Sequence, residues 1–185
     1  MILLRHGQSE FNAAFTLSRV DPGIVDPRLT ELGRAQAREA AEALKGERLA
    51  RVIASPYTRA LETAAIVAGV LDLPVVVNPI VRERCAFTCD IGTPASELAR
   101  RWPDLDFGHL DEVWWPALAE SEAEIEARAA AFRAEMAAIR DWSDTLVVSH
   151  WGFILALTGE RTRNGEWRRC DPTRPGPAAV PWVVG

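Results

Sequence analysis

Short apolar runs, each followed by a stretch of helical character, constrain the fold of this chain more than any other feature. The runs are Ile2 to Leu4, RVIAS at 51–55, LPVVV at 73–77 and TLVVS at 145–149. Runs without a polar face are typical of fully buried strands in parallel sheets. Such strands in alternation with helices predict an α/β fold with a mainly parallel central sheet.

Start and stop signals bound the expected helices. Ser55 is a candidate N-cap, with Pro56 at the first helical position and Gly69 at the end. Ser121 and Glu124 form a capping-box signature that opens a long helix. The apolar stripe of that helix is expected at Ile125, Ala129, Phe132, Met136 and Ile139.

The length of 185 residues favours one domain, residues 1–185. Regular patterning fails from about 78 to 119, which is rich in Pro, Asp and Trp, so we expect a lid-type insertion there with a short helix near 93–101. Its aromatic residues are expected to form mostly a small satellite core, and the alternative is a lid that contacts an apolar leaving group. The tail from about 171 carries four prolines and is expected to be irregular.

Charge and composition exclude several classes of function. The net charge of −5 argues against a nucleic-acid partner, and no apolar run reaches the roughly 18 residues that a membrane span needs. Met1 leads directly into Ile2 to Leu4 without a signal-peptide pattern, so a cytoplasmic location is expected. The three cysteines, Cys85, Cys89 and Cys170, predict neither a disulfide framework nor a metal site. The oligomeric state cannot be predicted.

Polar residues follow each of the apolar runs. Arg5 and His6 end the first, Arg59 lies in the first helical turn after the second, Glu83 follows the third and His150 ends the fourth. Ligands of open α/β sheets gather at the carboxyl ends of the strands. A cation in the first turn of a helix opposes the helix dipole unless an anion is bound there. These positions therefore predict an anion site, and arginine forks suit phosphate.

Histidine and carboxylate side chains at such a site could transfer a phosphoryl group. A neutral imidazole is a competent nucleophile toward phosphorus, and an arginine beside His6 would keep it neutral. A phosphate near His150 would favour the charged form of that residue. Glu83 could protonate the leaving oxygen if its pKa is raised.

The segments LLRHGQSEFN, LTELGRAQA, SPYTRALETA and VSHWGFI together resemble the successive signatures of the histidine phosphatase superfamily, the phosphoglycerate-mutase-like proteins, from about Ile2 to Leu157. The resemblance implies a three-layer α/β/α sandwich and no metal or other cofactor. It also implies His6 as the nucleophile that becomes phosphohistidine and Glu83 as the proton donor. The phosphate pocket that it implies consists of Arg5, Arg59 and His150, with Asn12 as a further contact.

Two features depart from the pattern of that family. Trp151 follows the second histidine, where many relatives have a small residue. CAFTCDIG follows Glu83 in place of a glycine-rich continuation, and Asp90 within it is an alternative proton donor. Asn12 has an alternative role at the start of a helix.

The chain is thus expected to be a metal-independent phosphomonoester hydrolase, a histidine acid-type phosphatase, acting on a small phosphorylated substrate or a phosphoprotein. One alternative is a phosphoglycerate-type mutase, which returns the phosphoryl group to a second hydroxyl. The other is a non-catalytic module that binds phosphorylated ligands.

Overall fold

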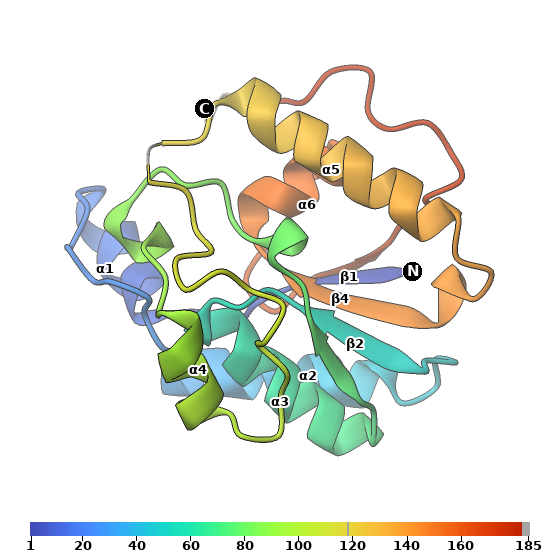
Figure 1. Cartoon of the computed structure of the whole chain (residues 1–185), viewed down its shortest axis with the longest axis horizontal. Coiled ribbons are helices and arrows are strands. Elements are labelled where there is room, and N and C mark those ends of the chain that lie inside the picture. The colour runs from blue at the N-terminus through green and yellow to red at the C-terminus, as the bar shows by residue number, and fades with distance from the viewer. Residues whose placement is uncertain (118, 183–185) are drawn as a thin grey trace.

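A five-stranded sheet lies between two layers of helices in the computed structural model, which describes residues 1–117 and 119–182 (Figure 1). The strand order is β3-β2-β4-β1-β5, in which the first four strands are parallel and β5 runs antiparallel to β1. This sheet confirms the predicted α/β class. The strands are β1 (Ile2–Arg5), β2 (Arg51–Ala54), β3 (Val75–Val77), β4 (Thr145–Ser149) and β5 (Trp167–Arg169).

Helices α2 and α3 cover one face of the sheet, and α5 and α6 cover the other, which makes the three layers expected (Figure 1). The helices are α1 (Glu10–Ser18), α2 (Glu31–Leu44), α3 (Thr58–Leu71), α4 (Ala95–Arg101), α5 (Glu122–Ala137) and α6 (Trp151–Thr158). Single 3₁₀ turns occur at η1 (Pro79–Val81), η2 (Thr88–Asp90) and η3 (Trp142–Asp144).

Each central strand contributes side chains to both cores. Ile2 and Leu4 of β1 pack into the core beneath α2 and α3, whereas Leu3 packs into the core beneath α5 and α6. In β4, Val147 likewise faces away from its two neighbours Leu146 and Val148. Successive side chains of a strand point to opposite faces, so a strand covered on both sides must be apolar throughout.

The outer strands differ from the sequence expectation. The run at 73–77 was expected to be a fully buried strand, but β3 lies at the sheet edge and Val76 is 50% exposed. That expectation was wrong because an apolar run does not reveal whether helices cover both of its faces. The short strand β5, which pairs with β1, was not predicted, since WRR has no apolar periodicity.

The boundaries of two helices also needed correction. Helix α3 begins at Thr58, after Ser55 and Pro56, and continues through Gly69 to Leu71. The capping box of α5 and its buried residues were predicted correctly, except that Ile139 lies beyond the helix end.

The start of α3 is capped by a distant residue. Asp26 accepts a hydrogen bond from the Thr58 backbone N–H at 2.9 Å and one from its hydroxyl at 2.7 Å. A first-turn N–H group needs an acceptor, and a side chain from any part of the chain can provide it. Ser55, expected as this cap, therefore keeps its hydroxyl available for another contact.

The segment 78–119 is largely irregular and contains α4, as expected. Its aromatic residues were expected to form mostly a small satellite core, which was wrong: Phe107 and Trp114 are buried in the main core beneath α2 and α3, and Trp102 and Trp115 pack against that core. Phe87 instead is 43% exposed. Whether this segment acts as a lid stays a prediction.

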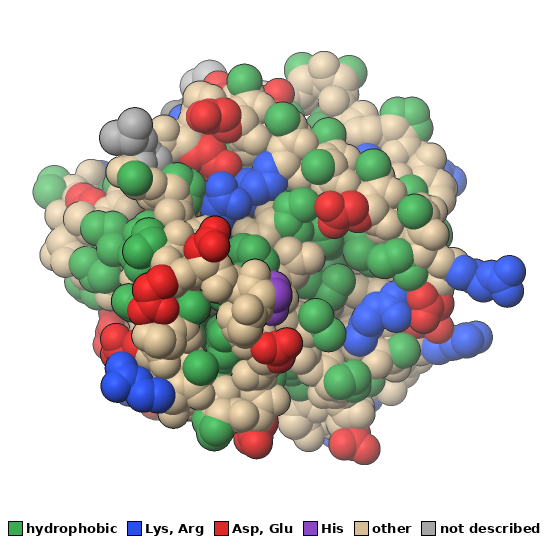
Figure 2. All heavy atoms as spheres, in the orientation of Figure 1, with side chains coloured by type: hydrophobic (Ala, Val, Ile, Leu, Met, Phe, Trp, Pro, Cys, Tyr) green, Lys and Arg blue, Asp and Glu red, His purple; other side chains and the backbone are tan. Residues whose placement is uncertain are grey.

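The tail from 171 to 182 has no helix or strand, as expected, and 183–185 lie outside the described residues. No helix within the described ranges is both long and apolar enough to cross a bilayer. Acidic and basic side chains are interspersed on the face shown in Figure 2.

Candidate active site

The two histidines meet at the carboxyl ends of neighbouring parallel strands. Arg5, the last residue of β1, is opposite Ser149, the last residue of β4. His6 and His150 are the next residues of their segments, and the His6 backbone N–H donates to the Ser149 carbonyl at 3.0 Å. Their ring centroids are consequently 5.0 Å apart, with the ring planes at 61°.

The turn after β1 is packed closely on the start of α2. A Cβ atom placed on Gly7 would lie 2.2 Å from the backbone oxygen of Gly33, and one placed on Gly33 would lie 2.1 Å from the Gln8 oxygen. Only glycine permits two backbone segments to approach this closely. The glycine of the RHG motif thus fixes the path of the chain just beyond His6.

The tautomer of His6 follows from a single hydrogen bond. Its Nδ1 lies 2.7 Å from the Gly7 carbonyl oxygen, which can only accept, so Nδ1 carries the proton. The lone pair of the neutral ring is then on Nε2. Burial lowers the pKa of His6 well below its usual 6.5, and the charges of Arg59 and Arg5 lower it further. His6 is therefore a neutral imidazole with one nucleophilic nitrogen.

His150 is held by the hydroxyl of Ser55, 2.8 Å from its Nε2. Burial, followed by the charge of Arg59, lowers the pKa of His150 well below its usual value, so its ring is neutral when nothing anionic is bound. Within the described residues, Nδ1 of this buried ring has no hydrogen-bond partner. If the Ser55 hydroxyl donates to Nε2, Nδ1 carries a proton that is free to bind an acceptor.

Arg5 presents a second polar atom without a partner. Its Nη1 donates to the Thr162 carbonyl at 2.7 Å, but its buried Nε has no acceptor among the described residues. Burial lowers the pKa of Arg5 to about 10, so the guanidinium is still charged at neutral pH. An unsatisfied buried donor costs roughly 1–3 kcal/mol. Oxygen atoms of an anion at this edge of the sheet could satisfy both Arg5 and His150.

Arg59 is the second buried guanidinium near the histidines. Its Nη1 donates to the Cys89 carbonyl at 2.7 Å and its Nη2 to Oδ1 of Asp90 at 3.0 Å. The guanidinium carbon lies 4.4 Å from the ring centre of Tyr57. Burial opposes its charge, but the carboxylate of Asp90 keeps the pKa of Arg59 above its usual value. Arg59 thus stays charged in a buried setting.

Glu83 is held at the start of α6 by the backbone N–H of Gly152. Its Oε1 accepts from the backbone N–H groups of Arg84 at 2.8 Å and Gly152 at 2.9 Å. Burial raises the pKa of Glu83, and the charge of Asp90 raises it further, although these hydrogen bonds oppose the shift. A raised pKa suits a carboxyl group that has to deliver a proton.

Asn12 takes part in the helix start that was its alternative role. Its Oδ1 accepts from the Ser9 backbone N–H at 3.2 Å, within the capping box of α1. The same oxygen accepts at 3.0 Å from Asn164, whose amide also donates to the His6 carbonyl at 3.2 Å. Asn12 therefore lies close to the His6 backbone, and its contact with a ligand stays a prediction.

Sequence reasoning missed several residues that hold these side chains. Ser55 was interpreted as an N-cap, and Gly152 was not singled out at all. Thr162 and Asn164 lie in a segment that contacts Arg5 and His6. The Asn164-Gly165 pair signals a turn, but no local pattern indicates that this turn lies against Arg5 and His6. The unusual Trp151 packs against Trp182 of the tail, with 6.3 Å between ring centres.

Two surface hollows lie away from the histidine pair. One, of about 470 Å³, is lined by residues of α2 and β5, and the other, of about 490 Å³, includes Arg82, Glu120 and Arg128. Neither is lined by His6, His150 or Arg59, and only 3% of His6 is exposed. The chemistry of the lining residues nevertheless favours the histidine pair as the candidate site.

Comparison with known proteins identifies the family. Residues 1–176 match the sequence model of the histidine phosphatase superfamily, branch 1. The chain belongs to this superfamily. The predicted family is therefore confirmed, and the phosphatases among its relatives are consistent with the predicted phosphomonoester hydrolysis.

Individual relatives include phosphatases and mutases. A glucosyl-3-phosphoglycerate phosphatase of Mycolicibacterium vanbaalenii is 32% identical over 85% of this histidine phosphatase and 72% of the relative. A probable phosphoglycerate mutase of Enterobacter sp. (strain 638) is 28% identical over 98% of this chain and 86% of that protein. The solved structure of a mycobacterial glucosyl-3-phosphoglycerate phosphatase complexed with VO3 superposes with a TM-score of 0.62, at 25% identity, over 90% of this chain and 88% of that one.

Proposed function

We propose that this histidine phosphatase hydrolyses a small phosphomonoester with His6 as the nucleophile. The observation that carries the proposal is the state of His6, a buried neutral ring whose Nδ1 is tied to the Gly7 carbonyl and whose ring centre lies 5.0 Å from that of His150. Nε2 attacks phosphorus, the bond to the leaving oxygen breaks, and the phosphoryl group is then held on His6.

The surrounding donors stabilise the charge that spreads over the phosphoryl oxygens. Arg5 and Arg59 contribute guanidinium groups, and His150 contributes the proton on Nδ1. These groups are already in place before substrate binds, because backbone carbonyls, Asp90 and Ser55 hold them. Preorganised donors of this kind commonly supply a large share of the catalysis of phosphoryl transfer.

Glu83 supplies the proton in the first step and accepts one in the second. Its carboxyl proton passes to the leaving oxygen, so the product departs as an alcohol. The resulting carboxylate takes a proton from water as that water attacks phosphohistidine, which releases inorganic phosphate and regenerates both residues. The assignment as an acid-type histidine phosphatase rests on this role of Glu83. Activity requires the protonated carboxyl group, so it declines as the pH rises above the raised pKa of Glu83.

The substrate class that we propose is a phosphorylated small organic molecule. The mycobacterial relatives named for glucosyl-3-phosphoglycerate support a sugar-acid phosphate of this kind. Similarity to probable phosphoglycerate mutases supports a second candidate, in which the phosphoryl group returns to another hydroxyl of the bound acid. Phosphopeptides, assayed for phosphate release beside small phosphorylated metabolites, test whether the substrate is a phosphoprotein.

The test compares the native protein with His6→Ala and with His109→Ala, a change of an exposed histidine in the 78–119 segment. In excess chelator, the native protein and His109→Ala should release phosphate from a phosphomonoester, whereas His6→Ala should lose the activity. A labelled phosphodonor should leave label that survives base and is lost in acid, the behaviour of phosphohistidine. Metal dependence or residual activity in His6→Ala would refute the mechanism.

The alternatives give different results in the same assay. Isomerisation of phosphoglycerate that is faster than phosphate release would establish the mutase. Ligand binding without any transfer of label would establish a non-catalytic binding module.

A further inference from the structure

Asp90 is a buried carboxylate whose oxygens all face donors. Oδ1 accepts from Arg59 at 3.0 Å and from the thiol of Cys89 at 3.5 Å. Oδ2 accepts from the backbone N–H groups of Ala86 and Phe87, both at 3.1 Å. The side chain of Asp90 is only 1% exposed and that of Arg59 only 3%. All of these contacts use the carboxyl oxygens of Asp90 as acceptors, so this side chain is held on both of its oxygen atoms.

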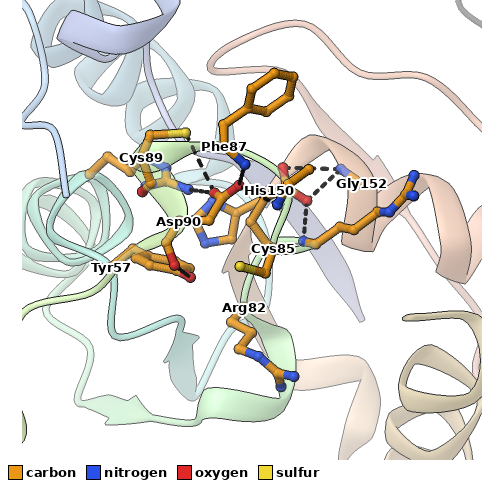
Figure 3. Close-up of polar contacts among 12 residues, drawn as sticks. Tyr57, Arg82, Cys85, Phe87, Cys89, Asp90, His150 and Gly152 are labelled. Atoms are coloured by element: carbon orange, nitrogen blue, oxygen red, sulfur yellow. Dashed lines mark hydrogen bonds and ion pairs between the residues drawn. The ribbon is translucent and has the colours of Figure 1, made fainter. Parts of the chain in front are cut away.

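The same contacts join two parts of the site. Arg59 comes from the first turn of α3, whereas Ala86 and Phe87 belong to the turn that follows Glu83. Figure 3 shows dashed lines from the carboxylate of Asp90 to Phe87 and to Cys89. The attachment is reinforced at Cys89, whose carbonyl accepts from Arg59 at 2.7 Å, and at Asp90 itself, whose carbonyl accepts from the Tyr57 hydroxyl at 2.5 Å.

We propose that Asp90 is a positioning residue, which fixes the guanidinium of Arg59 and the turn after Glu83 in one arrangement around the bound phosphate. This inference rests on the proposed function. Its chemistry requires an ionised carboxylate, because an amide oxygen could satisfy Arg59 or the two N–H groups but its NH₂ could not accept from the others. An Arg fork held on one edge can direct its remaining N–H groups at another acceptor.

Electrostatics gives Asp90 a second effect, on Glu83. The negative charge of Asp90 adds to burial in raising the pKa of Glu83, against the hydrogen bonds from Arg84 and Gly152 and the charge of Arg59. The charged guanidinium of Arg5 and the Glu83 carboxylate also attract each other, and Arg128 donates to the Glu83 backbone carbonyl at 3.3 Å. Without the charge of Asp90, Glu83 would lose its proton at a lower pH.

The test is Asp90→Asn, with Asp21→Asn as the matched control. Asp21 holds the same 3₁₀ turn from outside, through the Thr88 backbone N–H at 2.9 Å and the Thr88 hydroxyl at 2.5 Å. We expect Asp90→Asn to weaken the inhibition by inorganic phosphate about tenfold and to shift the alkaline decline of kcat to lower pH. Asp21→Asn should change the inhibition constant for phosphate by less than twofold and leave the pH of the alkaline decline of kcat unchanged.

A double-mutant comparison shows whether Asp90 acts through Arg59. In an Arg59→Ala background, Asp90→Asn should add no further loss of phosphate affinity, since the partner that it positions is gone. A full additional loss in that background would overturn the proposal. Tighter phosphate binding in Asp90→Asn would also overturn it, because Asp90 would then be a competitor of phosphate.

The proposal can fail independently of the proposed function. If the native protein forms phosphohistidine but Asp90→Asn leaves phosphate affinity and pH profile unchanged, the positioning role is wrong and the function stands. If the native protein forms none, the function fails, while phosphate affinity still tests Asp90. Should Asp90→Asn not fold, Asp90→Ser, which keeps a small acceptor for the turn, should show the same tenfold loss.

Discussion

Gly152→Ala is expected to disable the proton donor while leaving the rest of the site intact. Gly152 lies in the first turn of α6, and its backbone N–H binds Glu83 Oε1 at 2.9 Å. A Cβ atom at this position would lie 2.4 Å from Oε1, whereas ordinary contacts begin at 3.4 Å. The Glu83 carboxylate would therefore have to withdraw by about 1 Å, and a misplacement of that size can cost roughly 10²-fold in rate.

The variant should fold, because alanine is favoured over glycine in a helix by about 1 kcal/mol. Gly69→Ala is a matched control, since Gly69 also lies within a helix, α3, and a Cβ there would meet nothing within 4 Å. Gly69→Ala should gain about 1 kcal/mol of stability from helix propensity, with unchanged activity.

The assay compares kcat/KM for two substrates, because this ratio includes the first phosphoryl transfer and not the later release of phosphate. An alkyl phosphate needs protonation of its leaving oxygen, so Gly152→Ala should lower its kcat/KM about 100-fold, or about 2.7 kcal/mol. p-Nitrophenyl phosphate has a stable leaving anion and should lose less than tenfold. Equal losses for both substrates, or no loss for either, would refute the assignment of Glu83.

Two further predictions follow from the histidine pair. Ser55→Ala removes the hydroxyl that holds His150 Nε2 and should lower kcat/KM about tenfold, the effect of one lost hydrogen bond of roughly 1.4 kcal/mol, with normal phosphohistidine chemistry on His6. Stability should fall as the pH drops below 6.5, because unfolded His6 and His150 then gain protons that the folded rings, with lowered pKa values, do not bind. The slope from these two residues approaches about 2.7 kcal/mol per pH unit once the pH is well below 6.5, and the raised pKa of Glu83 opposes part of it. Urea unfolding at pH 7.5, 6.5 and 5.5 measures this loss, and an equal slope in His6→Asn/His150→Asn would contradict it.

Local patterns in the sequence determined the fold class and the position of most reactive groups. Apolar runs such as Ile2 to Leu4 fix buried strands, and the carboxyl ends of parallel strands lie at one edge, so Arg5, His6 and His150 could be placed together from chain order alone. The capping box at Ser121 was equally readable, because both of its partners lie within one turn.

Only the tertiary structure decided how each of these groups is held. Ser55 and Asp26 show the reason: the expected cap of α3 binds His150 instead, and a residue from a distant loop caps the helix. Asp90 likewise meets Arg59 from 31 positions away. A side chain binds whichever partner the packed layers bring within about 3 Å, and that proximity is a property of the assembled core and not of any local pattern. The sequence therefore determines which chemical groups are present and at which sheet edge, whereas their hydrogen-bond partners and protonation states depend on the completed fold.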